Sequence, residues 1–297
     1  MELPNGLQLT DLPRDERLDE LAGKVSKKRL RSSVTSLCEF RTRHTLSPHL
    51  AEAARWVEKR FRKLGYPDID CLAVIRQMPE LGRYATFYNI RCRKQGSGAL
   101  RRIVCAHLDS RTDGLFDFIS SAPGANDNAT GIAVLLELAR LLREVELVDT
   151  IEFVATSGEE QGLWGSTDYA ADLDHRKPQI RFMLNLDELG FPNDGREVVV
   201  EYDTGNKLRT NDKESKRIAT EVAYIATHQL GIATKRDEIN NSDYMPFERL
   251  GYVTIGLYES GDYDEFRHTG QDTMRRVDFD YLADVTRVGL TALLRDF

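Results

Sequence analysis

Five segments of the sequence place histidine or carboxylate side chains where an apolar run ends or a helix is expected to begin. These side chains are His107 with Asp109, Asp127, Glu159 with Glu160, Asp187 with Glu188, and His268. Four of the segments follow expected strands, and in open α/β sheets sites form at the carboxyl ends of the strands. Each residue alone has an ordinary explanation, since an Asp before a helix is usually an N-cap. Their joint occurrence at strand ends favours a single functional site.

The residue types in this set suit metal-assisted hydrolysis. Two imidazoles and several carboxylates form a donor set for a divalent ion such as Zn²⁺. One carboxylate can bridge two ions about 3.5–4 Å apart, as in two-metal hydrolases. Of the adjacent Glu159 and Glu160, one can bind metal while the other moves a proton. Asp109 lies two residues after His107 and can orient its imidazole.

The elements that must position these residues alternate along the chain. Strands are expected at 71–76, 85–93, 103–106, 150–156, 180–186, 197–202 and 252–257. Helices are expected within 13–40 and at 47–65, 130–143, 164–173, 215–230 and 278–294. Such alternation predicts a mostly parallel sheet covered by helices on both faces, which is a three-layer α/β/α sandwich.

Composition narrows the class of protein further. The 297 residues carry a net charge of −7, which argues against a general nucleic-acid or anionic-membrane binder. No run approaches the roughly 18 apolar residues of a membrane span. The N-terminus shows no apolar signal segment, so a cytoplasmic location is the expectation. Residues 1–45 are expected to form a helical extension packed on a single domain of residues 46–297.

Six segments together resemble the M28 family of zinc aminopeptidases and related exopeptidases. They are HLDS (107–110), GANDNATG (124–131), SGEEQGLWGS (157–166), LNLDELG (184–190), SDYMPF (242–247) and HTGQDT (268–273). The match is ordered and spans roughly residues 50–297. The resemblance implies a mixed, mostly parallel sheet of the phosphorylase/hydrolase-like type, with two zinc ions per chain. It also implies a cis peptide bond between Asp127 and Asn128.

The resemblance assigns a role to each residue of the site. It implies that Asp127 bridges the metals, that His107 and Asp187 complete one metal site, and that Glu160 and His268 complete the other. Glu159 falls at the position of the general base, and Asp109 falls where the family orients its first histidine ligand.

One position departs from the family. Many relatives place an aromatic residue before the last histidine ligand, whereas this chain has Arg267. Its guanidinium could support an oxyanion or bind a substrate carboxylate, and a surface arginine is the plain alternative. Tyr258 and Tyr263 are nearby alternatives, and Asp243 of the SDYMPF segment is a further candidate for substrate contact.

Four functions are compatible with these residues. The leading hypothesis is an aminopeptidase that removes N-terminal residues from peptides. A carboxypeptidase or dipeptidase of the same family would use a cation such as Arg267 to hold the substrate carboxylate. A glutaminyl-cyclase-like transferase would need only one zinc, and the complete ligand set disfavours it. A binding protein on an inactive scaffold is disfavoured by the intact ligands and Glu159. The sequence does not predict the oligomeric state.

Overall fold

One mixed sheet of eight strands forms the centre of the molecule in the computed structural model, which describes residues 8–78, 82–205, 208–261 and 265–295. The strands are β1 (Ile69–Met78), β2 (Arg83–Lys94), β3 (Arg101–His107), β4 (Thr150–Thr156), β5 (Ile180–Leu186), β6 (Val198–Tyr202), β7 (Thr234–Glu238) and β8 (Thr254–Tyr258). Their spatial order is β1-β2-β4-β3-β5-β8-β6-β7.

The four central strands run parallel, and this sets the position of the site. β3 pairs with β4 on one side and with β5 on the other, and β5 pairs in turn with β8. His107, the last residue of β3, lies opposite Thr156, the last residue of β4. The loops that follow all four strands therefore leave the same edge of the sheet.

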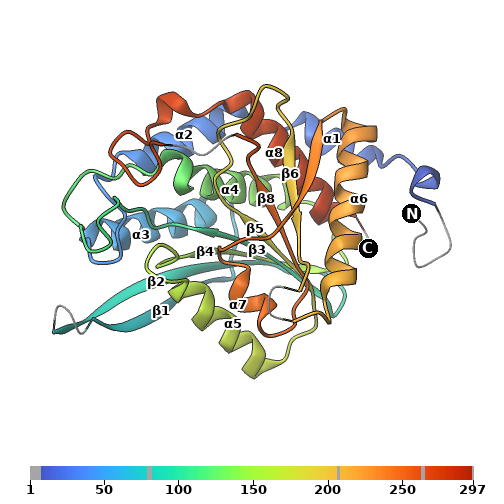
Figure 1. Ribbon diagram of the computed structural model, residues 1–297. Coiled ribbons are helices and arrows are strands. Elements are labelled where there is room, and N and C mark those ends of the chain that lie inside the picture. Colours follow the sequence, from blue (N-terminus) through green and yellow to red (C-terminus); the bar gives the residue numbers. More distant parts are fainter. Residues whose placement is uncertain (1–7, 79–81, 206–207, 262–264, 296–297) are drawn as a thin grey trace.

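Helices cover both faces of this sheet. They are α1 (Glu16–Gly23), α2 (Lys27–Cys38), α3 (Pro48–Lys63), α4 (Gly131–Leu142), α5 (Trp164–Arg176), α6 (Asp212–Leu230), α7 (Met245–Glu248) and α8 (Phe279–Leu294). In Figure 1, α2, α4 and α8 lie above the sheet, and α5 and α7 lie below it. In the described ranges, no helix has both the length and the apolar character that a bilayer crossing needs.

Alternate side chains of β3 pack into two separate apolar clusters, one on each face of the sheet. Val104 and Ala106 belong to the larger apolar cluster, which includes buried residues of α4 and α8. Ile103 and Cys105 belong to the smaller cluster, which includes buried residues of α5 and α7. Successive side chains point to opposite faces of a strand, so a fully apolar run is the signature of a strand covered on both sides. The predicted α/β/α fold is confirmed.

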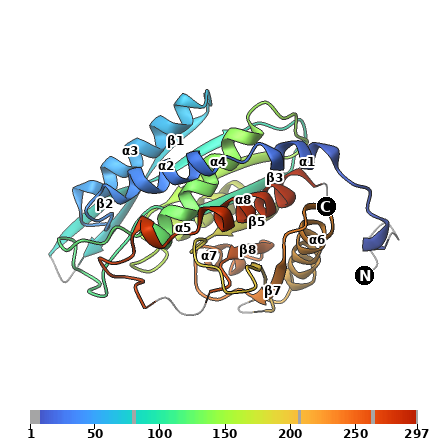
Figure 2. The ribbon, with the colours of Figure 1, turned by 90° about the horizontal axis from the view of Figure 1, so that it is seen from above.

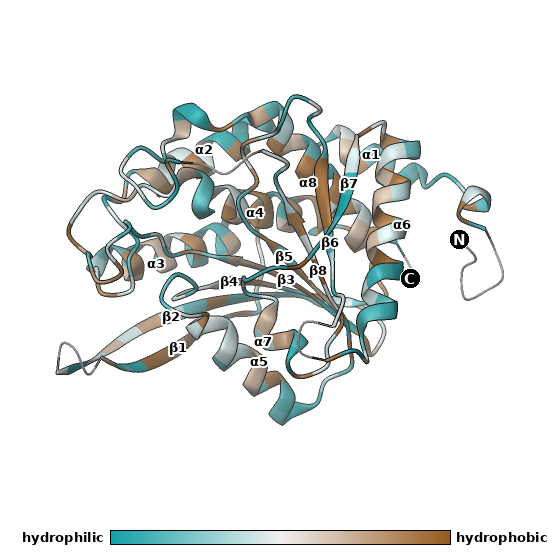
Figure 3. Cartoon of the chain, viewed as in Figure 1, coloured by the Kyte–Doolittle hydropathy of each residue, from teal (hydrophilic) through white to brown (hydrophobic). Residues whose placement is uncertain are grey.

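Two elements escaped the sequence prediction. The sequence of β7 is Thr-Lys-Arg-Asp-Glu, which contains none of the apolar residues by which a strand is recognised in a sequence (Figure 3). Such a polar strand is possible here because β7 lies at the edge of the sheet. α7 has only four residues, which is too short for a helical period to show. The expected helix within residues 13–40 is two helices, because Ser26 caps a new helix by accepting the N–H of Arg29.

The N-terminal helices lie close to the site. α2 packs beside α4 and α8, as the view from above shows (Figure 2). Beyond α2, the fully buried Arg43 donates hydrogen bonds to the backbone carbonyls of Leu37, Leu108, Pro123 and Gly124. These carbonyls belong to the end of α2 and to two distant parts of the one connection between β3 and α4, which carries Asp127. The extension expected at residues 1–45 therefore supplies a cation that ties the two parts of this connection together, and the proposed boundary at residue 45 stays a prediction.

We expect Arg43→Met to lower the free energy of unfolding by about 3–5 kcal/mol, because it removes hydrogen bonds from four backbone carbonyls, of which only those of Leu37 and Gly124 also accept a backbone N–H among the described residues. Urea denaturation of both proteins measures the difference. Arg41→Met is the matched control, since Arg41 is exposed and its loss is expected to change the free energy by less than about 0.5 kcal/mol. Equal midpoints for the two variants would contradict the clamping role of Arg43.

Candidate metal centre

The two carboxylate oxygens of Asp127 lie against two different histidines. Oδ1 is 3.1 Å from Nε2 of His107, and Oδ2 is 3.1 Å from Nε2 of His268. The side chain is buried, with 3 % of its surface exposed. Asp127 thus stands between two groups of donors, which is the placement that a bridging ligand requires.

The first group consists of His107, Asp127 and Asp187, whose donor atoms lie within 4.8 Å of one another. Oδ1 of Asp187 is 3.1 Å from Nε2 of His107. Ser242 donates a hydrogen bond of 2.6 Å to the other oxygen, Oδ2, and so fixes the rotation of the carboxylate. Asn185 donates to the Ser242 oxygen at 2.8 Å, which extends the support by one residue.

The second group consists of Asp127, Glu160 and His268, again with all donor atoms within 4.8 Å. Oε2 of Glu160 is 2.9 Å from Nε2 of His268 and accepts a hydrogen bond of 2.9 Å from Arg111. Within the described part of the chain, Oε1 of Glu160 makes no hydrogen bond, although the atom is buried. Buried polar atoms are normally satisfied, so this oxygen indicates a missing partner.

Zinc fits both groups by donor chemistry and by spacing. Nitrogen and carboxylate oxygen are common zinc ligands, and two ligands in a tetrahedral site lie roughly 3.3–3.6 Å apart. The observed separations of 2.9–3.1 Å are close to that value. Burial lowers the pKa of His268, but Asp127 and Glu160 outweigh it and raise this pKa to about 9. The centre therefore has an excess of buried negative charge that cations would offset.

Asp109 holds the two glutamates of the neighbouring loop. Its buried carboxylate accepts the backbone N–H groups of Glu159 and Glu160 at 3.3 and 3.1 Å. The same carboxylate is 3.7 Å from Nδ1 of His107, whereas the backbone oxygen of Asp109 is only 3.2 Å from that nitrogen. Asp109 thus orients His107 chiefly through its main chain and fixes the loop at residues 159–160 through its side chain.

Glu159 lines a cavity of about 380 Å³ together with Glu160 and His268. Among the described residues, nothing hydrogen-bonds to its carboxylate, in contrast with the other carboxylates of the centre. Burial raises the pKa of Glu159 well above its ordinary value. A free carboxylate of raised pKa beside the donor groups suits a residue that accepts and returns a proton.

Three of the four substrate-contact candidates can be placed. Arg267 donates to Oδ2 of Asp127 at 3.1 Å and lies 3.3 Å from Glu188, so its guanidinium is at the centre rather than on a remote surface. Tyr258 donates to Glu188 at 2.8 Å. Asp243 is fully buried and accepts a hydrogen bond from Thr156, so its side chain has no exposed surface for a substrate in this structure. Tyr263 lies outside the described residues.

Sequence reasoning missed the residues that support the Asp127 loop. Asp272 accepts the backbone N–H groups of Asn126 and Asp127 at 2.8 and 3.1 Å. Gly124 has a φ of +54°, and a Cβ there would stand 2.4 Å from the backbone oxygen of Asp127. Asp272 occurs in the HTGQDT segment, which was the available signal for it. The Asp127–Asn128 peptide bond is cis, as the family resemblance implies.

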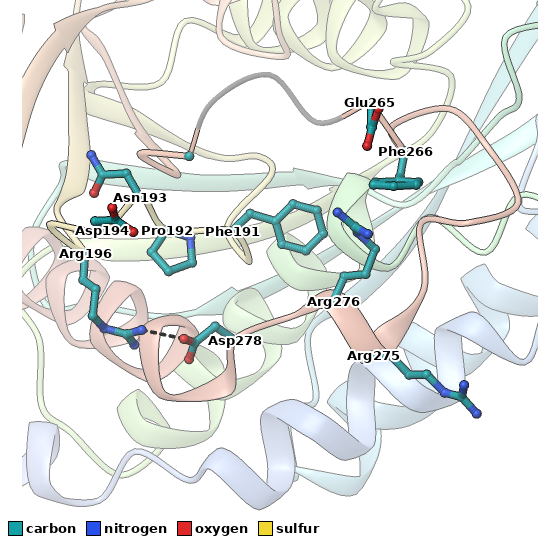
Figure 4. A pocket seen from close by; sticks show the side chains of 11 residues that line it. Phe191, Pro192, Asn193, Asp194, Arg196, Glu265, Phe266, Arg275, Arg276 and Asp278 are labelled. Atoms are coloured by element: carbon teal, nitrogen blue, oxygen red, sulfur yellow. Dashed lines mark hydrogen bonds and ion pairs between the residues drawn. The ribbon is translucent and has the colours of Figure 1, made fainter.

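A larger cavity of about 1090 Å³ lies beside the loop that precedes His268 (Figure 4). Arg276 extends between the rings of Phe191 and Phe266, with its guanidinium carbon 5.4 and 3.5 Å from the two ring centroids. The described residues that line this cavity include none of the predicted metal ligands. The volume of a cavity therefore does not identify the candidate metal centre. The predicted metal ligands Glu160 and His268 line the smaller cavity, together with Glu159.

We expect Asp127→Ala to bind less than one metal ion per chain and to have a lower Tm than the wild type. The variant loses the one carboxylate shared by both groups, and bound metal stabilises the native state by mass action. Elemental analysis of the dialysed protein and thermal unfolding measure the two effects. The exposed Asp113→Ala is the control and should match the wild type. Two tightly held ions in Asp127→Ala would rule out the bridging role.

Comparison with known proteins places this centre in a family. The family model described as peptidase family M28 matches residues 89–293. A probable zinc metalloprotease of Pyrenophora teres f. teres is 28% identical over 97% of this chain and 70% of its own length.

Solved structures have the same fold. The LapA aminopeptidase of Legionella pneumophila superimposes with a TM-score of 0.80 at 16% identity, over 95% of this chain and 72% of its own. A glutaminyl cyclase of Bacteroides thetaiotaomicron superimposes with a TM-score of 0.75 at 18% identity, over 92% of this chain and 99% of its own. At 16–18% identity, these structural similarities show the fold only. The family is shown by the sequence model, which covers well over half of the chain. The chain belongs to peptidase family M28.

Proposed function

We propose that this M28 peptidase is a two-zinc aminopeptidase. The observation that carries the proposal is the division of the Asp127 oxygens between two histidine-carboxylate pairs. One zinc would be held by Asp127 with His107 and Asp187, and the other by Asp127 with Glu160 and His268. Bound zinc would lower the pKa of a water molecule toward about 7 and polarise the scissile carbonyl.

Glu159 is the residue that moves the proton in this proposal. Its carboxylate lines the cavity and is free of hydrogen bonds within the described residues, while Asp109 fixes its backbone. It takes the proton of the attacking water and returns it to the leaving amine. The adjacent Glu160 cannot share this role, because His268 and Arg111 already face its carboxylate.

Charge favours the amino end of the substrate. A second cavity of about 380 Å³ borders the centre, and its lining includes six carboxylates against the cations Lys235 and Arg267. The carboxylates are Asp187, Glu188, Glu201, Asp237, Glu238 and Glu259. Burial raises the pKa of Glu201 to about 8, so this residue is mostly neutral at pH 7, but the exposed Asp237 and Glu238 still attract the ammonium group of a free N-terminus and repel a substrate carboxylate. We therefore place the N-terminal residue of a peptide substrate in this acid-lined cavity.

The glutaminyl cyclase alternative is supported by one observation, the fold shared with the bacterial cyclases. Its product would be pyroglutamate from a peptide with N-terminal glutamine. Incubation with such a peptide followed by mass spectrometry separates loss of ammonia from loss of the first residue.

We expect Glu159→Gln to keep both metal ions and to lose about 10²–10⁴-fold in kcat, because the amide cannot accept a proton. Turnover of a leucyl peptide and elemental analysis of the same preparation are the measurements. An unchanged kcat would contradict the assignment of Glu159 as the general base. A loss of zinc from the variant would indicate that Glu159 is a metal ligand instead.

We expect N-acetylation of a leucyl peptide to reduce kcat/KM by about 10- to 100-fold, the usual worth of a charged hydrogen bond at a partly buried site. Acetylation removes the positive charge and adds bulk where the ammonium binds. The measurement compares the free and acetylated forms of one peptide. Equal cleavage of the two forms would exclude an aminopeptidase and favour the carboxypeptidase alternative.

A further inference from the structure

The cavity that contains Glu159 has a wall unlike that of the acid-lined cavity. Three arginines line it, Arg111, Arg249 and Arg267, and among the residues that the structure describes its acidic lining residues are Glu159 and Glu160. Both of these glutamates already have roles at the metal centre. Asn241 and Arg267 line both cavities, so the two adjoin. The centre thus lies between an acidic and a basic cavity of equal volume.

The three arginines differ in the partners they have. Arg111 is bonded to Glu160, and Arg267 is bonded to Asp127 and lies near Glu188. The side chain of Arg249 is exposed and forms no hydrogen bond or ion pair with any residue that the structure describes. A cation that lines a catalytic cavity without a protein partner is available to a ligand.

The position of Arg249 is tied to that of a proposed metal ligand. Arg249 follows α7 directly, and its backbone N–H donates to Met245 at 3.1 Å. The segment that leads into α7 contains Ser242, which hydrogen-bonds Asp187. One short stretch of chain therefore holds Asp187 and carries Arg249 to the rim of the cavity.

We propose that the cavity lined by Arg111, Arg249 and Arg267 binds a substrate carboxylate on the leaving-group side of the scissile bond. Guanidinium groups match carboxylates through paired N–H donors. A residue spans only about 3.3–3.6 Å, so the α-carboxylate of a dipeptide or tripeptide falls close to the scissile bond. An acidic side chain just after the scissile bond offers the same chemistry. The preferred substrates are thus short zwitterionic peptides or peptides with an acidic second residue.

This inference rests on the proposed aminopeptidase function, because it takes the acid-lined cavity to hold the amino end. Together the two cavities match both charges of a free dipeptide. Lengthening the peptide moves the α-carboxylate out of the basic cavity, so the advantage of a free carboxylate should decline with length.

The test compares kcat/KM of the zinc-loaded enzyme for matched peptides. Leu-Gly against Leu-Gly amide reports on the α-carboxylate, and Leu-Glu amide against Leu-Gln amide reports on a side-chain carboxylate. We expect the acidic member of at least one pair to be preferred by about 10-fold or more. The pair that shows the preference identifies the source of the carboxylate. Equal rates within both pairs would overturn the proposal.

Substitutions of Arg249 test whether the preference for an acidic substrate depends on this cavity. Arg249→Ala is expected to reduce the preference several-fold, and Arg249→Lys to keep part of it, because lysine retains the charge but not the paired donors. Arg55→Ala removes an exposed arginine of α3 and should keep the wild-type activity and preference. An unchanged preference in Arg249→Ala would overturn the role of Arg249.

The outcome of this test can be distinguished from a failure of the proposed function. The preference is the ratio of the kcat/KM values of two matched peptides measured on one preparation, so partial loss of folded protein does not alter it. Cleavage of acetyl-Leu-Gly, compared with that of Leu-Gly, tests only whether a free amino group is required. Rapid cleavage of acetyl-Leu-Gly would contradict the aminopeptidase function, and the kcat/KM ratios of the acidic and neutral peptides would still test the carboxylate site.

Discussion

The concentration of buried negative charge at one edge of the sheet is the constraint around which the structure is organised. Asp127 and Asp187 are almost fully enclosed, and Glu160 lies beside them with an unsatisfied oxygen. Buried carboxylates are costly unless they are paired, so this edge needs cations. Protonated imidazoles can supply part of that charge in the metal-free protein, and zinc bound as proposed would replace their charge, because an imidazole that binds a metal is neutral. The surrounding residues serve to hold the carboxylates in place despite their mutual repulsion.

Support for the centre comes from residues far apart in the chain. Arg43 lies before the first strand and donates to carbonyls at both ends of the segment from Leu108 to Gly124, which follows β3. Asp272, near the C-terminus, accepts N–H groups of the Asp127 loop. The loop that carries Asp127 is therefore held from two sides by buried charged groups of opposite sign. Such a loop has little freedom to relax, which suits the bridging role proposed for Asp127.

Adjacent residues take different roles because their surroundings differ. Glu159 and Glu160 are identical in type, and Asp109 fixes the backbone N–H groups of both. The side chain of Glu160 faces His268 and Arg111, whereas that of Glu159 lines the cavity without a partner in the described residues. The two cavities beside the centre also differ in their charged residues. Acidic residues predominate in the lining of one, and three arginines line the other together with Glu159 and Glu160.

The sequence alone determined the α/β/α class and the positions of the donor residues. Apolar runs marked the central strands, and the carboxyl ends of parallel strands share an edge, so the sequence predicted that the residues after these strands lie at one edge. That His107 and Asp187 are neighbours there depends on the spatial order of the strands, in which β3 lies beside β5. Only the tertiary structure showed Arg43, whose bonds span 65 and 81 residues to Leu108 and Gly124. In sequence it is one more charge in a basic segment. A buried cation such as Arg43 and an exposed one such as Arg249, for which the described residues provide no hydrogen-bond or ion-pair partner, look alike in the sequence. Their difference lies in contacts that form only when distant segments pack.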